Sequence, residues 1–216
     1  MRILICAAHP DDEVLLCGGY AKRLSIENHT VKTLILSEGA LSRDDATQEN
    51  VDTLKEETAA ANVALGIWKT EVFKYPDNEF DIMTVKTIAQ DITDVVKEFK
   101  PDICVTHTEK DLNNDHKMTH EAVKVATRPQ SGVHLVLAGE VLSSTECNNT
   151  AFTPNYFVDI SKTIDAKIEA MKCYKSELRE HPHPRSLKGI QALSEFRGTQ
   201  CNKENAEAFE VIRMIV

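Results

Sequence analysis

The sequence contains no long apolar run, no block of basic residues and no two cysteines spaced by two residues. No apolar stretch approaches the about 20 residues of a transmembrane helix, so we expect no membrane span. The chain has 25 basic and 34 acidic residues and a net charge of −9, which argues against nucleic acid as a partner. Its 6 cysteines indicate neither a disulfide framework nor a thiolate zinc site.

Three further sequence features are also missing: a signal peptide, a dinucleotide-binding fingerprint and internal repeats. Met1 and Arg2 lead into an expected strand rather than into the apolar core of a signal peptide, so we expect a cytoplasmic protein. The glycine fingerprint that dinucleotide-binding proteins carry after their first strand is absent. Repeats and low-complexity tracts are absent too, and nothing in the sequence excludes a homo-oligomer.

What the sequence does contain, up to about residue 145, is an alternation of apolar strand-like runs and helix-like segments. This alternation predicts an α/β fold, a Rossmann-like, mostly parallel sheet flanked by helices. We expect a single domain over 1–216, with a core over 1–145 and a small C-terminal helical extension over 146–216 that also adds a strand. The last two helical stretches of that extension are expected at 187–197 and 204–212.

The most distinctive stretch is His9-Pro10-Asp11-Asp12-Glu13, which directly follows a buried-strand pattern over 2–8. Asp11 or Asp12 could cap the next helix, since an aspartate at such a turn is ordinary. However, a helix cap requires one acid and no histidine, so capping alone does not explain a stretch with a histidine and three acids. Ligands of open α/β sheets bind beyond the carboxyl ends of the strands, so an imidazole and several acids there indicate a divalent metal.

A second polar stretch, 111–116, follows the expected fourth strand. The first and fourth strands are often neighbours, which would bring His9, Asp12 and His116 together. Two imidazoles and one carboxylate leave a position open for water, as in catalytic Zn²⁺ sites, and the same set suits Fe²⁺. Asp11 would then be free to take a proton from water as a general base.

Three neighbouring features have plainer interpretations. His120 stands four residues after His116, but the residue after His116 is lysine, which excludes the zinc-protease motif. We interpret His116 as the ligand and His120 as a packing or supporting residue. Asp77 and Asn78 are interpreted as turn-forming residues. The segment 181–186 either covers a substrate or is a surface linker.

The stretches 8–13 and 111–116 resemble the LmbE-like (PIG-L) family of zinc-dependent N-deacetylases. Residues 37–39, 76–78 and 197–198 are similar to further family features, and the resemblance covers most of the chain. It implies a hydrolase that removes the acetyl group from a small N-acetylated sugar or sugar conjugate. By position, it also implies Zn²⁺ on three residues and a general base on a fourth, namely His9, Asp12, His116 and Asp11.

The chain departs from the family pattern at one position. Family members commonly have His-Pro-Asp-His where this chain has 113–116, so Asn113 replaces a histidine that helps to stabilise the oxyanion or protonate the amine. Asparagine can donate a hydrogen bond but cannot act as an acid. Either Asp11 returns the proton itself, or His183 or His107 supplies it.

Arg43 follows the turn after the second strand, where the family tends to place a substrate-binding arginine; the alternative is a solvated loop charge. The candidates for contacting the substrate or supporting the ligands are Arg43, Asn113, Asp115 and His183. Two other functions remain open. One is a zinc amidase acting on a thiol or other conjugate, and the other is a non-catalytic Rossmann-like protein that binds a sugar or nucleotide.

Overall fold

The computed structural model describes residues 1–40 and 47–216, so Arg43 lies outside the described residues. The strands are β1 (Arg2–Ala7), β2 (Thr30–Ser37), β3 (Lys69–Tyr75), β4 (Ile103–His107), β5 (Leu135–Gly139), β6 (Tyr156–Asp159) and β7 (Ala206–Met214). They form a 7-stranded sheet in the order β3-β2-β1-β4-β5-β7-β6. Strands β1 to β5 pair in parallel, and β7 is antiparallel to β5 and β6. The prediction of a Rossmann-like, mostly parallel sheet is confirmed.

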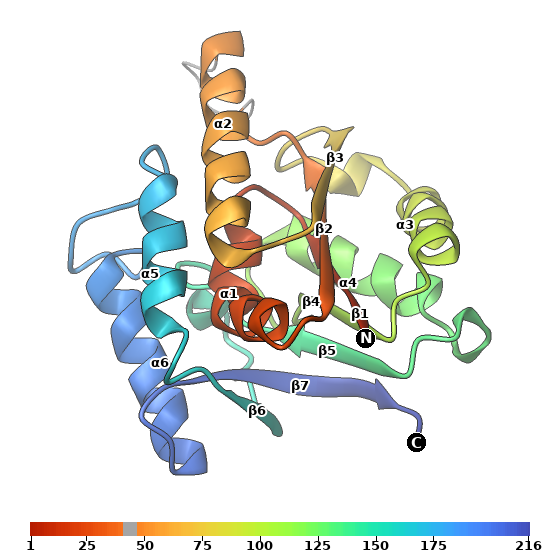
Figure 1. The fold of residues 1–216 in the computed structure, drawn as a ribbon. Helices are drawn as coiled ribbons and strands as arrows, with labels where there is room; N and C mark the ends of the chain where they lie inside the picture. The colour runs from red at the N-terminus through yellow and green to blue at the C-terminus, as the bar shows by residue number, and fades with distance from the viewer. Residues whose placement is uncertain (41–46) are drawn as a thin grey trace.

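Helices cover both faces of the sheet. They are α1 (Asp12–Ile26), α2 (Gln48–Leu65), α3 (Val85–Phe99), α4 (Asn114–Ala126), α5 (Ile164–Cys173) and α6 (Leu187–Cys201). Helices α1, α2, α5 and α6 lie on one side, and α3 and α4 on the other (Figure 1). The β1 side chains alternate between two cores: Ile3 and Ile5 pack in one, and Leu4 and Cys6 in the other.

Local signals in the sequence fix several helix ends. Thr47 caps α2 with a reciprocal bond to Asn50, and Gly66 ends that helix in the left-handed conformation, with φ of 76°. The Asn113 side chain caps α4 by accepting from the Asp115 amide. None of the helices in the described residues is long and apolar enough to cross a membrane.

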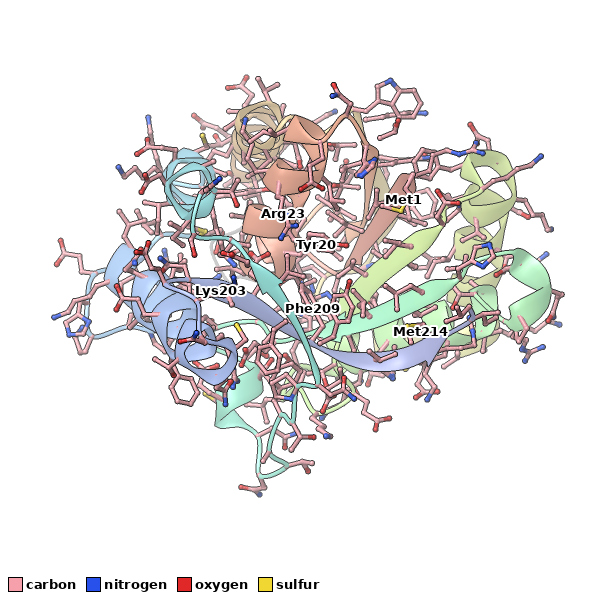
Figure 2. The ribbon with its side chains drawn as sticks, turned by 60° about the horizontal axis from the view of Figure 1, so that its bottom comes forward. Met1, Tyr20, Arg23, Lys203, Phe209 and Met214 are labelled. Atoms are coloured by element: carbon pink, nitrogen blue, oxygen red, sulfur yellow. The ribbon has the colours of Figure 1, made fainter. Side chains whose placement is uncertain are left out.

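The expected helix at 204–212 is wrong, because residues 206–212 belong to strand β7, which begins at Ala206. Alanine and glutamate favour a helix locally, but pairing with β5 and β6 overrides that preference. Figure 2 shows β7 crossing the face turned toward the viewer. Phe209 of β7 lies beside Tyr20 of α1, with ring centroids 6.1 Å apart. Residues of 146–216 therefore extend the same sheet that carries β1.

Helix α1 is interrupted at Cys17, where φ is −153°. A buried ion pair compensates for the lost helical hydrogen bonds. Glu207 of β7 accepts from the amides of Gly19 and Tyr20, at 2.9 and 2.7 Å. Lys167 of α5 lies 2.6 Å from Glu207 and donates to a carbonyl before the break. Helix α1, which begins at the His-Pro-Asp-Asp-Glu stretch, is thus tied to the C-terminal part of the sheet.

Candidate active site

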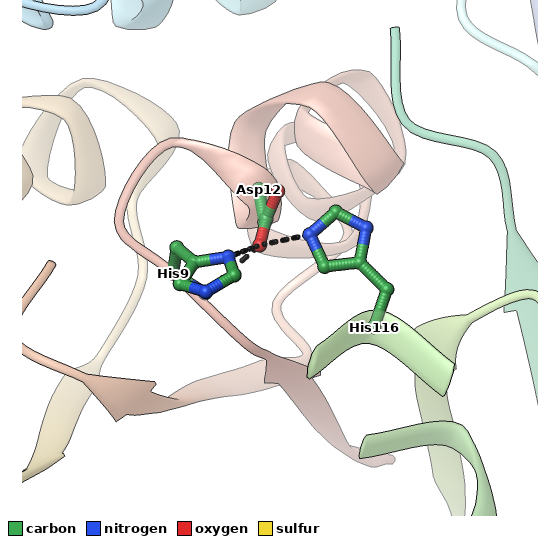
Figure 3. Close-up of side chains that lie close together, drawn as sticks. All are labelled: His9, Asp12 and His116. Carbon is green, nitrogen blue, oxygen red and sulfur yellow. Dashed lines mark hydrogen bonds and ion pairs between the residues drawn. The ribbon is translucent and has the colours of Figure 1, made fainter. Parts of the chain in front are cut away.

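Three candidate ligands meet at the carboxyl ends of β1 and β4, which are neighbours as expected. His9 follows β1, Asp12 begins α1, and His116 lies in the first turn of α4 (Figure 3). Asp12 Oδ2 is 3.4 Å from His9 Nδ1 and 3.3 Å from His116 Nε2. The three ligating atoms lie within 4.8 Å of one another. One cation could therefore contact all three atoms with small side-chain movements.

Each imidazole has a carboxylate on the nitrogen that faces away from Asp12. His9 Nε2 lies 2.9 Å from Asp115 Oδ2, and His116 Nδ1 lies 3.2 Å from Asp111 Oδ1. Carboxylates in these positions fix the tautomer and raise the basicity of metal-binding histidines. The chemistry of this donor set therefore fits a zinc ion.

Asp115 is held in place by backbone donors. Its carboxylate accepts from the amides of Asn78 and Phe80, at 2.8 and 3.0 Å, besides contacting His9. Asp77, interpreted from the sequence as a turn former rather than a ligand, also lies with its Oδ1 3.4 Å from His9 Nε2. Of the two roles foreseen for Asp115, these contacts favour support of His9 over contact with a substrate.

We predict that Asp115→Asn weakens zinc affinity about 10- to 100-fold, because His9 Nε2 loses its 2.9 Å carboxylate partner and is left with the more distant Asp77 at 3.4 Å. Competition titration against a chromophoric chelator measures this change. The matched control is Asp81→Asn, an exposed acid that follows Phe80 directly in the same turn. Equal affinities for the Asp115 variant and the wild type would exclude the supporting role.

The buried charges shift one another strongly. Burial opposes ionisation of Asp12, but the charge of His116 outweighs it and holds the pKa of Asp12 well below the ordinary value. Burial likewise opposes protonation of His9, yet Asp115 and Asp12 raise its pKa to about 10. The pKa of His116 rises to about 9 because Asp12 and Asp111 outweigh burial. Without a metal, the two imidazoles therefore carry the positive charge that balances Asp12.

These shifts predict how stability varies with pH in metal-free protein. The folded pKa values of His9 and His116, about 10 and about 9, exceed the ordinary 6.5. Their stabilisation is therefore complete below pH about 6.5 and is lost as the pH rises through about 9 to 10. After chelation, we expect the Tm to fall by about 10 °C between pH 7 and pH 10. His9→Gln should flatten this profile and His120→Gln should not; a flat wild-type profile would contradict the assignment.

Asp11 occupies a different position from Asp12. It precedes α1 with φ of 91°, and its side chain caps no helix amide, so the capping interpretation is not supported. Asp11 Oδ2 accepts from Arg185 Nη1 at 2.9 Å. Burial and the charge of Asp12 raise the pKa of Asp11 well above its ordinary value, and Arg185 opposes the rise. Asp11 is thus a buried carboxylate beside the candidate ligands, and it has a cationic partner.

A cavity of about 360 Å³ opens onto these groups. Asn113 lines it, but His107 and His183 are absent from its lining. His107 stacks on His116, with ring centroids 3.9 Å apart, and burial lowers its pKa to about 3. The His183 Nδ1 atom accepts the Arg185 amide at 3.1 Å. The remaining lining is partly apolar and partly polar: Leu15, Leu54, Leu112, Val141, Leu142, Asp77, Asn78, Ser143, Ser144, Glu177 and Arg185, among others.

His120 is not among the residues that line the cavity. Its Nδ1 pairs with the His107 carbonyl at 2.8 Å. Its Nε2 lies 3.7 Å from Glu109, and these two residues form a separate potential metal-binding group with Glu121. Lys124 already contacts Glu121 at 2.8 Å. The group that lines the cavity is therefore the stronger candidate for a metal site.

Arg185 and Glu177 line the cavity but are not among the site residues that the sequence predicts. Arg185 stands 174 residues after its partner Asp11, so no local spacing links the two. The sequence hint to Arg185 is the high density of hydrogen-bond donors in 181–186, which is consistent with a segment that covers a substrate.

Comparison with known proteins identifies the family of the chain. The family described as PIG-L, GlcNAc-PI de-N-acetylase, matches residues 4–127, more than half of the chain. The chain belongs to the PIG-L family. A diacetylchitobiose deacetylase from Thermococcus kodakarensis is 26% identical over 192 residues, which cover 83% of this chain and 71% of that protein.

Solved structures show the same fold. An N,N'-diacetylchitobiose deacetylase from Pyrococcus horikoshii superposes with a TM-score of 0.80 at 19% identity, covering 98% of this chain and 83% of that one. A 4-carboxy-2-hydroxymuconate hydratase from Pseudomonas putida superposes with a TM-score of 0.78 at 22% identity, covering 100% of this chain and 97% of that one. The PIG-L fold is therefore shared by proteins named for different reactions, and the reaction must be argued from the site.

Proposed function

We propose that this protein is a zinc-dependent N-deacetylase that removes the acetyl group from a small N-acetylated sugar or sugar conjugate. The reaction releases acetate and a free amine. The observation that carries the proposal is the meeting of two imidazoles and two carboxylates, those of His9, His116, Asp12 and Asp11, in the wall of one cavity. This set combines a metal centre with a separate base, as amide hydrolysis by water requires.

His9, Asp12 and His116 would hold the metal ion. When bound, zinc supplies Lewis-acid polarisation of the acetamide carbonyl and makes water more acidic; Fe²⁺ is the alternative ion for the same donors. Asp11 takes the proton from the attacking water. As the carbon–nitrogen bond breaks, Asp11 delivers that proton to the leaving nitrogen, which departs as the free amine. We assign both transfers to Asp11 because His107 and His183 do not line the cavity and Asn113 cannot act as an acid.

The cavity supports a small substrate. Its volume, about 360 Å³, is near the lower end for ligand sites. Leu112, Leu142 and Leu54 offer apolar contact for the apolar faces of a sugar, and the side-chain amides of Asn78 and Asn113, which bond to each other at 3.2 Å, add a polar edge to the same cavity. The name of the relative from Thermococcus kodakarensis, diacetylchitobiose deacetylase, supports an N-acetylated sugar as the substrate.

The 6 free cysteines support a reducing compartment, so we propose the cytoplasm as the location of this protein.

The experiment is an acetate-release assay on N-acetylglucosamine and N,N'-diacetylchitobiose before and after chelation. We expect release to stop on chelation and to return with Zn²⁺, and a parallel addition of Fe²⁺ identifies the better ion. Amide cleavage of a thiol-bearing sugar conjugate without acetate release would favour the amidase. Hydration of 4-carboxy-2-hydroxymuconate would favour a hydratase. Absence of stoichiometric metal would favour a non-catalytic binding protein.

A further inference from the structure

Arg185 reaches the candidate base from a distant part of the chain. It is the last residue before Ser186, which caps α6, and it ends the segment that follows α5. Its side chain is 22% exposed and lines the cavity. The backbone on either side is fixed, because the Arg185 amide donates to His183 Nδ1 at 3.1 Å and the Ser186 hydroxyl caps α6. The guanidinium is therefore presented to the cavity by a well-anchored turn.

The guanidinium is shared between two buried acids. Its Nη1 lies 2.9 Å from Asp11 Oδ2 and 3.2 Å from Glu177 Oε2. Its Nε is buried and has no acceptor within the described residues. The contacts of Nη1 with the two carboxylates set the orientation of this side chain. They hold it in place although leaving the buried Nε donor unpaired costs free energy.

The backbone of Asp11 is also fixed. Its amide donates to Glu13 Oε2 at 3.2 Å, and its carbonyl accepts from the amides of Val14 and Leu15 at 3.0 Å each. With the main chain fixed, the remaining freedom of Asp11 is rotation of its carboxylate. Arg185 engages Oδ2, and Oδ1 has no hydrogen-bond partner in the part of the chain that the structure describes.

We propose that Arg185, held by Glu177, is a positioning residue that orients the Asp11 carboxylate so that one oxygen stays available for the attacking water. This inference rests on the proposed function, because it assigns Asp11 as the base. Direct binding of an anionic substrate group is the weaker interpretation of Arg185. Two carboxylates already balance its charge, and Asp77 and Asp12 add further negative charge to the cavity wall.

The first test is the kinetics of Arg185→Ala on N-acetylglucosamine derivatives. We expect kcat to fall about 100-fold because a misplaced base slows the chemical step. KM should change little and zinc content not at all. Guanidinium chloride at millimolar concentration should raise the kcat of Arg185→Ala about tenfold, because the free ion can occupy the site that the arginine side chain has vacated. A single nitrogen makes both contacts, so Arg185→Lys should retain more activity than Arg185→Ala.

The matched control is Arg179→Ala, an exposed arginine of the same segment that donates to nearby carbonyls and not to Asp11. It should keep wild-type kinetics. A loss confined to KM, a loss of zinc, or no rescue by guanidinium would each overturn the positioning role.

A crystal structure of Arg185→Gln gives a readout that does not depend on activity. We expect the Asp11 carboxylate to rotate or to adopt several orientations. An unchanged Asp11 would overturn the inference even if the wild type deacetylates sugars. Failure of the wild type to release acetate would instead count against the proposed function, and the crystallographic result would still decide whether Arg185 orients Asp11.

Discussion

Replacing Asp11 by asparagine is expected to lower kcat for acetate release about 1,000-fold, a typical loss for a missing general base. Asparagine has the same shape as aspartate, and its amide oxygen can still accept the bond from Arg185. It cannot take a proton at neutral pH. The candidate metal ligands are His9, Asp12 and His116, so zinc content should stay at the wild-type level. Steady-state kinetics and metal analysis of the same preparation measure both quantities.

Asp94→Asn is the control for this variant, because Asp94 is an exposed acid of α3 that pairs only with a neighbouring lysine in the described contacts. It should leave kcat and zinc content unchanged. If Asp11→Asn keeps kcat within about tenfold of the wild type, water is activated without a base at this position. If Asp11→Asn instead loses zinc, Asp11 belongs to the ligand set.

The parts of the site that could be predicted are those encoded locally. His9, Asp11 and Asp12 follow a strand pattern directly, and parallel strands carry their carboxyl ends to the same edge of the sheet. The neighbouring position of β1 and β4 follows from common α/β topology, so His116 could be expected near them. Asn113 as the cap of α4 could not be distinguished from a substrate-binding residue, because both roles need a polar side chain at that position.

The parts that could not be predicted depend on contacts between distant segments. Strand β7 contains helix-forming residues, and only its pairing with β5 and β6 makes it a strand. Glu207 illustrates the same limit, since its buried role needs Lys167 and the break in α1. Arg185 reaches Asp11 only because the segment after α5 returns to the cavity. No spacing of residues in the sequence predicts contacts of this kind between distant segments.

Replacing His116 by glutamine is expected to have the largest effect of all. The variant loses one of the two proposed imidazole ligands, so we expect no stoichiometric zinc after purification. Activity should fall at least about 10,000-fold, because the Lewis acid and the water that Asp11 would deprotonate are lost together. Metal analysis and the acetate-release assay are the measurements. Zinc retained at the wild-type stoichiometry would contradict the ligand assignment.

His120→Gln provides a matched comparison, because His120 is also buried and lies one turn further along the same helix. This variant removes the 2.8 Å contact with the His107 carbonyl and should cost about 1 kcal/mol of stability. Zinc content and kcat should stay near wild-type values. The reverse result, zinc lost with His120 and kept without His116, would move the metal centre to the group formed by Glu109, His120 and Glu121. That group is not part of the cavity lining, so the reverse result would also remove the physical basis for hydrolysis at Asp11.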